Sequence, residues 1–258
     1  MLKRILLTVL ITAASVSIGT GYIHFASSQA ERGLASLRCN GVEVRILDSA
    51  ESRIVTREDV MNALKEAPQA VGLKTSEIDL CGIEDLLGQR GEILNAEVYA
   101  RNDGIMYVEI RQRHPAMRLC LPDGAVYSDS QGYLFPITNP SDVPVVTGAI
   151  PVSVPDTGKG FAASEQEREW LDSMLRLGKY IDSHDYWRTE VGQIDIEKDG
   201  DAVLYLRSSR ERFILGDCEH IERKFNRIST YYRTIAPLDT NKRYTCINLK
   251  YNKQIVCK

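Results

Sequence analysis

The stretch LNAEVYARNDGIMYVEI, residues 94–110, decides the fold of the first part of the chain. Apolar residues occupy every second position on both sides of the pair Asp103-Gly104. These alternating residues are Leu94, Ala96, Val98 and Ala100 before the pair, and Met106, Val108 and Ile110 after it. A period of two is typical of a strand with one buried face, and Asp-Gly is a preferred hairpin turn. The stretch therefore predicts a β-hairpin.

A strand and two helices are predicted before this hairpin. Apolar and charged residues alternate over Val42–Leu47, which predicts a strand. Thr56 and Asp59 have the spacing of a capping box at a helix start, and Pro68 is expected to end that helix. A second helix is predicted over Ile83–Leu87. The order strand, helix, helix, strand, strand describes a small α+β unit.

The first of these helices is expected to pack on the hairpin. Its apolar stripe consists of Val60, Ala63, Leu64 and Ala67, which share one helical face. We expect Val60 and Leu64 to pack on the sheet face that carries Met106, Val108 and Ile110.

The sequence after Pro115 is rich in strands. Alternation and Asp-Gly or Asn-containing turns mark the predicted strands. They are Val191–Ile196, Val203–Leu206, Phe213–Leu215 and a terminal hairpin of Tyr244–Lys250 and Gln254–Cys257, which turns near Asn252-Lys253.

Two helices and one long loop complete this second part. Ser164 and Glu167 form a capping box ahead of one helix. The other has an apolar stripe of Ile221, Phe225, Ile228 and Tyr232. The segment Pro136–Lys159 contains five prolines, which predicts a loop that crosses the domain.

The N-terminal segment Ile5–Ile23 carries no charge and has the length needed to cross a bilayer. Because Lys3 and Arg4 precede it, the positive-inside rule predicts a cytoplasmic N-terminus and a body outside the cytoplasm. The alternative is a signal peptide cleaved after Ser28-Gln29-Ala30, a small-residue site. Both interpretations export the rest of the chain.

Composition and motifs give no indication of catalysis. The net charge of −3 argues against a nucleic-acid-binding surface. The six cysteines form no C-x-x-C pair, so they are interpreted as mostly buried thiols, although export would permit disulfides. No nucleophile elbow, P-loop, dinucleotide fingerprint or zinc-protease motif is present, and the four histidines lack metal-ligand spacing. We predict no catalytic, cofactor-binding or metal site; a protease or amidase triad built from distant residues is the alternative.

Six stretches resemble one known family when taken in order. They are Val42–Ile110, similar to a POTRA domain; Ile110–Ala116, similar to a V-x-E-R-x-P-x-A junction; Tyr127–Phe135, similar to D-x-x-G-x-x-F; Val143–Gly148, similar to L-P-x-L-x-G; Leu215-Gly216 with Lys224, similar to L-G-x-x-x-x-x-x-K; and Tyr244–Tyr251, similar to x-x-I-D-L-R-Y. This order resembles the FtsQ/DivIB cell-division family. Gln112, Asn248 and Lys250 depart from the family's usual Glu, Asp and Arg.

The resemblance implies an α+β protein with four parts. These are a cytoplasmic tail at 1–4, a transmembrane helix at 5–23, a POTRA domain (β-α-α-β-β) at 40–112 and a strand-rich β domain with two helices at 113–258. It further implies a non-enzymatic divisome scaffold of the inner membrane, enriched at the division septum. Such a protein binds FtsB- and FtsL-type partners and helps to couple septum assembly to cell-wall synthesis. The short tail makes cytoplasmic interactions doubtful.

Two other kinds of protein remain as alternatives. One is a signal-cleaved periplasmic binding module that contains a POTRA domain. The other is an outer-membrane assembly factor, which would need many alternating barrel segments that the region after Pro115 does not supply.

The terminal hairpin is the predicted partner-binding site. A last strand is often a sheet edge, whose unpaired backbone groups accept an incoming peptide, and the resemblance implies that FtsB docks there. Thr245, Ile247 and Leu249 are expected to face the core. The predicted partner-binding residues are Tyr244, Cys246, Asn248, Lys250, Tyr251, Gln254 and, on the preceding helix, Lys224. The alternative is that the hairpin only completes the sheet.

Overall fold

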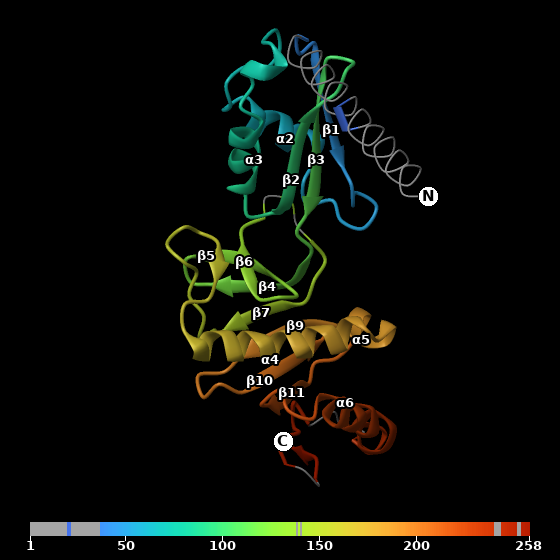
Figure 1. The fold of residues 1–258 in the computed structure, drawn as a ribbon. Coiled ribbons are helices and arrows are strands. Elements are labelled where there is room, and N and C mark those ends of the chain that lie inside the picture. The colour runs from blue at the N-terminus through green and yellow to red at the C-terminus, as the bar shows by residue number, and fades with distance from the viewer. Residues whose placement is uncertain (1–19, 22–36, 138, 140, 240–243, 252–253) are drawn as a thin grey trace, which may run out of the picture. The chain divides into compact units, whose positions relative to one another are not determined.

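The computed structural model describes residues 20–21, 37–137, 139, 141–239, 244–251 and 254–258. The chain forms two compact units, shown in Figure 1. Unit 1 contains the residues up to Ser49 together with Thr56–Arg111, and unit 2 contains Ala50–Val55 and Gln112–Lys258. The segment Ala50–Val55 therefore interrupts unit 1 in sequence and belongs to unit 2 by its contacts.

Unit 1 has a three-stranded sheet in the order β1-β3-β2. The strands are β1 (Gly41–Ile46), β2 (Ile93–Ala100) and β3 (Ile105–Gln112). The predicted hairpin is confirmed: the Arg101 N–H donates to the carbonyl of Ile105 at the turn. Gly104 has φ +75°, and a Cβ there would lie 2.9 Å from the Arg38 carbonyl oxygen, so the turn requires glycine. β1 pairs in parallel with β3, and the two helices lie between β1 and β2 in the sequence.

Two helices pack on the same side of this sheet (Figure 1): α2 (Arg57–Leu64) and α3 (Leu80–Gly88), with a short 3₁₀ turn η1 (Thr75–Glu77) between them. The predicted capping box of Thr56 and Asp59 is present. α2 ends at Leu64 rather than at Pro68, because the N–H groups that follow donate three residues back, which tightens the chain into a turn.

The buried face of unit 1 matches the expected stripe only in part. Val60, Ala63 and Leu87 are buried, together with Met106, Val108 and Ile110 of β3. Leu64, however, is only half-buried, and Leu94 is 52% exposed. α2 packs against β1 and α3, so its buried line runs through Val60 and Ala63 and leaves Leu64 at the margin.

The other face of the unit 1 sheet is covered by stacked side chains. Tyr99 and Tyr107 stack with ring centroids 5.5 Å apart. The guanidinium carbons of Arg45 and Arg101 lie 4.7 and 4.5 Å from the centroid of the Tyr107 ring. The Tyr99 hydroxyl donates to Glu109 at 2.8 Å. These cation–π and hydrogen-bond contacts bury Tyr107 on the sheet face opposite to the one that carries Met106 and Val108.

Unit 2 is built on one ten-stranded sheet in the order β13-β12-β11-β10-β9-β7-β4-β5-β6-β8. The strands are β4 (Pro115–Leu121), β5 (Gly124–Asp129), β6 (Tyr133–Phe135), β7 (Val145–Gly148), β8 (Gly160–Phe161), β9 (Val191–Ile196), β10 (Ala202–Leu206), β11 (Arg212–Gly216), β12 (Cys246–Asn248) and β13 (Val256–Cys257). The predicted strands between 191 and 215 are confirmed within one residue at each end.

The prediction of a loop over Pro136–Lys159 is wrong at its centre. β7 lies within this segment and pairs in parallel with both β4 and β9. Val146 of β7 is fully buried. The strand has four residues and follows Pro144, so its own sequence is too short to show a period of two; its two neighbours in the sheet stabilise it.

One row of side chains crosses the unit 2 sheet and forms its core. The row follows the strand register through Leu119, Val146, Ile194, Leu204, Phe213, Ile247 and Cys257. All but Cys257 are fully buried, and Cys257 packs against the same core. Residues in register point to one face of a sheet, so this face is the inner one.

Helices cover the inner face: α4 (Glu165–Asp182), α5 (Asp185–Glu190) and α6 (Ile221–Thr230), followed by a π-helical turn η2 (Tyr231–Ile235) and a 3₁₀ turn η3 (Ala236–Leu238). Figure 1 shows α4 as the longest of these helices. Its predicted capping box is present, and hydrogen bonds from Ser153 and Ser164 lower the pKa of Glu167 to about 2. α5 follows α4 after two residues, and Trp187 packs it against the core.

A buried polar cluster begins unit 2. Arg113 donates to the Asp129 carboxylate at 2.6 Å, and both side chains are largely buried. The Arg113 guanidinium carbon lies 3.8 Å from the centroid of the Tyr133 ring. Gln112 is fully buried; its amide oxygen accepts from Val55 N–H and its amide nitrogen donates to the Ser52 carbonyl, both at 2.8 Å. This cluster joins Ala50–Val55, β4 and the turn between β5 and β6.

The expected membrane segment Ile5–Ile23 lies, apart from Thr20 and Gly21, outside the described residues. In the part of the chain that the structure describes, no helix combines the length and the apolarity needed to cross a membrane. All six cysteines are described, and none of them forms a disulfide. Cys39, Cys218 and Cys246 are buried and Cys81 is exposed.

Replacing Arg113 by Gln tests the polar cluster. The variant leaves the buried carboxylate of Asp129 without its cation, so we expect the free energy of unfolding to fall by about 3–5 kcal/mol. Urea unfolding of the full chain measures this loss. Arg111→Gln, which removes an exposed arginine two residues earlier, is the matched control. Equal unfolding midpoints for the two variants would contradict a stabilising role for the pair.

Candidate functional site

The last strand, β13, lies at one end of the sheet order. It pairs antiparallel with β12, with Ile247 opposite Cys257 and Asn248 opposite Val256. Lys258 N–H donates to the Cys246 carbonyl at 2.9 Å, and Cys246 N–H donates to the Lys258 carbonyl at 3.0 Å. Because backbone groups alternate in direction along a strand, the N–H and C=O of Cys257 point away from β12. This open edge is the candidate partner site.

The predicted hairpin is thus present, but its paired part is shorter than expected. β12 and β13 together have five residues, and the expected turn at Asn252-Lys253 lies outside the described residues. Ile247 and Leu249 are fully buried, as expected for the core-facing set. Thr245 of that set, which lies just before the first residue of β12, is exposed instead.

The outer face of the sheet next to this edge is partly apolar. A second register row runs through Thr147, Asp195, Val203, Ile214, Asn248 and Val256. It alternates with the core row and so faces away from the helices. Its last three members, Ile214, Asn248 and Val256, are half-buried. They form a strip of side chains that runs up to the open edge.

The predicted partner-binding residues do not all reach this surface. Tyr251 is 52% exposed, Gln254 is exposed, and Tyr244 is half-buried. Cys246 points outward from β12 but is only 9% exposed, because neighbouring side chains cover it. The structure therefore brings Tyr244, Tyr251 and Gln254 to the surface and keeps Cys246 beneath it.

Lys224 is buried, with 6% of its surface exposed. Its ammonium group donates to the Asp217 carbonyl at 2.8 Å and to the Asp217 carboxylate at 2.5 Å. It thereby satisfies backbone and carboxylate oxygens at the connection between β11 and α6. The side chain has a structural position and is not presented to a partner, contrary to what its sequence suggested.

Lys250 is held by its own chain. Its ammonium group pairs with the Asp201 carboxylate, and this hydrogen bond raises the pKa of Lys250. Its stem crosses Gly216, where φ is +76° and a Cβ would lie 2.8 Å from the Lys250 Cγ. The glycine of the Leu215-Gly216 stretch is therefore needed both for the backbone and for the close approach of Lys250.

One exposed apolar residue near the edge was missed. Leu238 at the end of η3 is 80% exposed. The next residue, Asp239, accepts a hydrogen bond from Tyr244 N–H at 2.9 Å, which places Leu238 beside the start of the terminal segment. The sequence signal was an isolated leucine after Pro237, which is too common to indicate a site.

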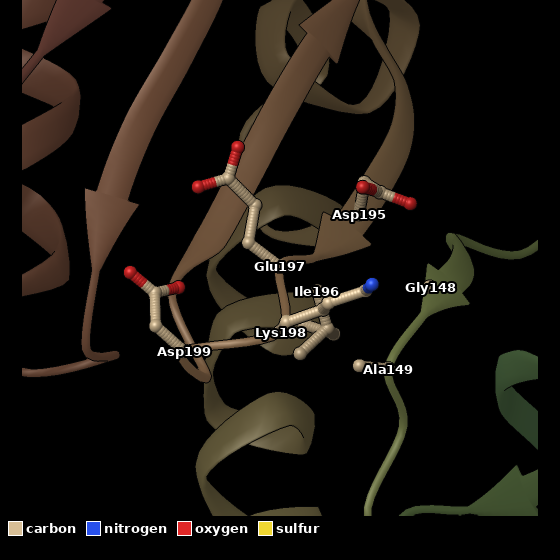
Figure 2. Close-up of a pocket in the computed structure, with 7 residues that line it drawn as sticks. All are labelled: Gly148, Ala149, Asp195, Ile196, Glu197, Lys198 and Asp199. Atoms are coloured by element: carbon tan, nitrogen blue, oxygen red, sulfur yellow. The ribbon is translucent and has the colours of Figure 1, made fainter.

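A shallow hollow lies at the end of β9 and is lined by Gly148, Ala149 and residues 195–199 (Figure 2). Glu197 and Asp199, with Asp201, bring three carboxylates within 4.8 Å of one another. Arg212 donates to Glu197 at 2.9 Å, and Lys250 pairs with Asp201. Figure 2 shows Asp195 on the other side of the strand end, and its carboxylate accepts from the Thr147 hydroxyl at 2.6 Å. The acidic residues Glu197, Asp201 and Asp195 therefore already have ion-pair or hydrogen-bond partners within the protein.

Comparison with known families matches both units. A family described as FtsQ/DivIB, C-terminal related matches residues 114–258, and a POTRA-like domain matches residues 37–111. No curated protein matches the chain. The first match covers more than half of the chain and corresponds to the ten-stranded unit with its open C-terminal edge. The chain therefore belongs to the FtsQ/DivIB family.

Proposed function

We propose that the chain is a cell-division scaffold that acts by binding other proteins rather than by catalysis. Membership of the FtsQ/DivIB family supports a role in cell division. Within this proposal the N-terminal segment anchors the chain in the inner membrane, and the two units lie outside the cytoplasm and concentrate at the septum. The partners are proteins of the FtsB and FtsL type, whose binding helps to couple septum assembly to cell-wall synthesis.

The open edge of β13 is the observation that carries the proposed binding mode. An extended partner segment adds as a further strand and pairs with the outward N–H and C=O of Cys257. Pairing between backbones supplies affinity but little specificity, so adjacent side chains must select the partner.

The side chains around the edge suit this selection. Tyr251 and Tyr244 offer aromatic surface with a polar tip, and Leu238 offers an exposed apolar contact. Aromatic residues are common among the few that dominate binding energy. The strip of Ile214, Asn248 and Val256 extends this surface onto the outer face, and we propose that a helix of the partner packs there.

Unit 1 is proposed to recruit the chain to the division site through a strand edge of its own. The outer edge of β2 is engaged at one point, where the Glu84 carboxylate accepts from Val98 N–H at 2.7 Å. β1 is the opposite edge of that sheet. Leu47 N–H donates to Ile110 on β3, so the backbone groups of Val44 and Ile46 point outward. β1 is therefore the edge of unit 1 that we propose for a partner.

The edge is tested with Cys257→Pro. Proline removes the outward N–H without removing a bond to β12, and edge strands tolerate it at such positions. We expect unchanged thermal unfolding of the full chain and a Kd raised about tenfold or more for the FtsB-type protein of the same organism. Tyr251→Ala is expected to act in the same direction.

Tyr186→Ala is the matched control for Tyr251→Ala, because Tyr186 is 58% exposed on α5. Its Kd should equal that of the unchanged chain. If Cys257→Pro and Tyr251→Ala both bind like the unchanged chain, the partner site lies elsewhere and the hairpin only completes the sheet.

The anchor is tested by fusing a reporter that is active only outside the cytoplasm after Lys258. Uncharged residues follow Lys3 and Arg4, so we expect an active reporter that remains in the membrane fraction. N-terminal sequencing of the product distinguishes retention from cleavage. A soluble product that begins near Glu31 would replace the anchor with a cleaved signal peptide.

A further inference from the structure

The segment that follows β12 is held by a side chain from α6. The Arg227 guanidinium donates through the same nitrogen to the carbonyl of Leu249 at 2.8 Å and to the carbonyl of Tyr251 at 2.5 Å. Arg227 is half-buried, whereas Arg223, one turn earlier on the same helix, is exposed. One arginine thus bridges α6 and two carbonyl groups that lie beyond the last residue of β12.

Both carbonyls lie beyond the point where the strand ends, and that of Leu249 is part-buried whereas that of Tyr251 is exposed. β12 stops at Asn248, and Asn248 turns the chain by accepting Lys250 N–H on its side-chain oxygen at 3.0 Å. The part-buried carbonyl of Leu249 costs stability unless a donor reaches it, and at Tyr251 the same guanidinium replaces water as the donor. Hydrogen bonds from a charged donor are shorter and stronger than neutral ones.

Packing against the core does not fix the orientation of the Tyr251 side chain. The side chain is 52% exposed, and β13 has only two residues to order the segment from the other side. The position of Tyr251 therefore depends on its backbone, which Arg227 holds directly. Lys250, the residue between the two carbonyls, is held separately by Asp201.

We propose that Arg227 is a positioning residue for the partner site: Leu249 is fixed by its buried side chain and by its N–H bond to Ile214, and Arg227 holds the backbone at Tyr251, beyond that point, so that the Tyr251 side chain is presented. This inference rests on the proposed function, because a positioning role for Arg227 has meaning only if the terminal segment binds a partner. Arg227 itself does not touch the partner. Its effect on binding passes through Tyr251.

Hydrogen–deuterium exchange of the full chain, purified in mild detergent without any partner, tests the positioning step. Arg227→Gln should leave the thermal melt unchanged and accelerate amide exchange about tenfold in the peptides that span 245–258, as expected for local opening. Arg223→Gln is the matched control and should exchange like the unchanged chain. Arg227→Lys keeps the charge but loses the planar fork, so its exchange should lie between the two.

Binding of the FtsB-type protein tests the link to Tyr251. Arg227→Gln should raise its Kd by about tenfold, and the double variant Arg227→Gln/Tyr251→Ala should bind no more weakly than Tyr251→Ala alone, since residues that act through one another are not additive. If Arg227→Gln lowers the melt, Arg227→Lys takes its place in both measurements.

The outcomes separate the two proposals. Exchange at 245–258 that is unchanged in both Arg227 variants overturns the inference, as does an effect on Kd that adds fully to that of Tyr251→Ala. If exchange accelerates while Tyr251→Ala and Cys257→Pro bind normally, the proposed function fails and the positioning role for binding fails with it, whereas the contact of Arg227 with the segment stands.

Discussion

The ion pair between Arg113 and Asp129 is the interaction on which the rest of unit 2 depends. Arg113 is the second residue of this unit after the hairpin of unit 1, and Asp129 ends β5. The same carboxylate accepts from the N–H groups of Gln131 and Tyr133, at 2.9 and 3.0 Å, and so closes the turn into β6. A buried carboxylate requires both a cation and donors, and this one obtains them from three parts of the chain. The entry into β4 and the β5–β6 turn are thereby set together.

The sheet extends from this cluster in one direction towards the C-terminus. β4 pairs with β7, β7 with β9, and the order then runs through β10, β11 and β12 to β13. β13 is therefore at one end of the sheet. Among the described residues, no further strand pairs with its outer backbone groups. Lys250 and Arg227 contact the segment that follows β12, and Lys224 contacts the connection between β11 and α6.

The structure gives a physical role to several residues in the stretches that resemble the family. Asp129 and Arg113 neutralise each other, and Gly216 makes room for Lys250. Lys224 satisfies oxygens of Asp217 beneath the surface. These residues contribute to the fold of unit 2 beneath or beside its surface, whereas Tyr251, Gln254 and Leu238 are exposed. Tyr251 ends one of the stretches that resemble the family, so those stretches contain both buried and exposed residues.

The sequence alone determined the elements whose signal is local. The hairpin around Asp103-Gly104, the capping boxes at Thr56 and Ser164 and the strands from 191 to 215 follow from turn chemistry and periodicity within a few residues. The tertiary structure alone decided three other features. β7 is a strand because β4 and β9 flank it, and Lys224 is buried because Asp217 meets it. Cys246 is covered by its neighbours on the outer face. In each case the contact that decides the outcome is made by a residue that the local sequence pattern does not identify. A lysine or a short apolar run has the same sequence pattern whether it is buried or exposed in the fold.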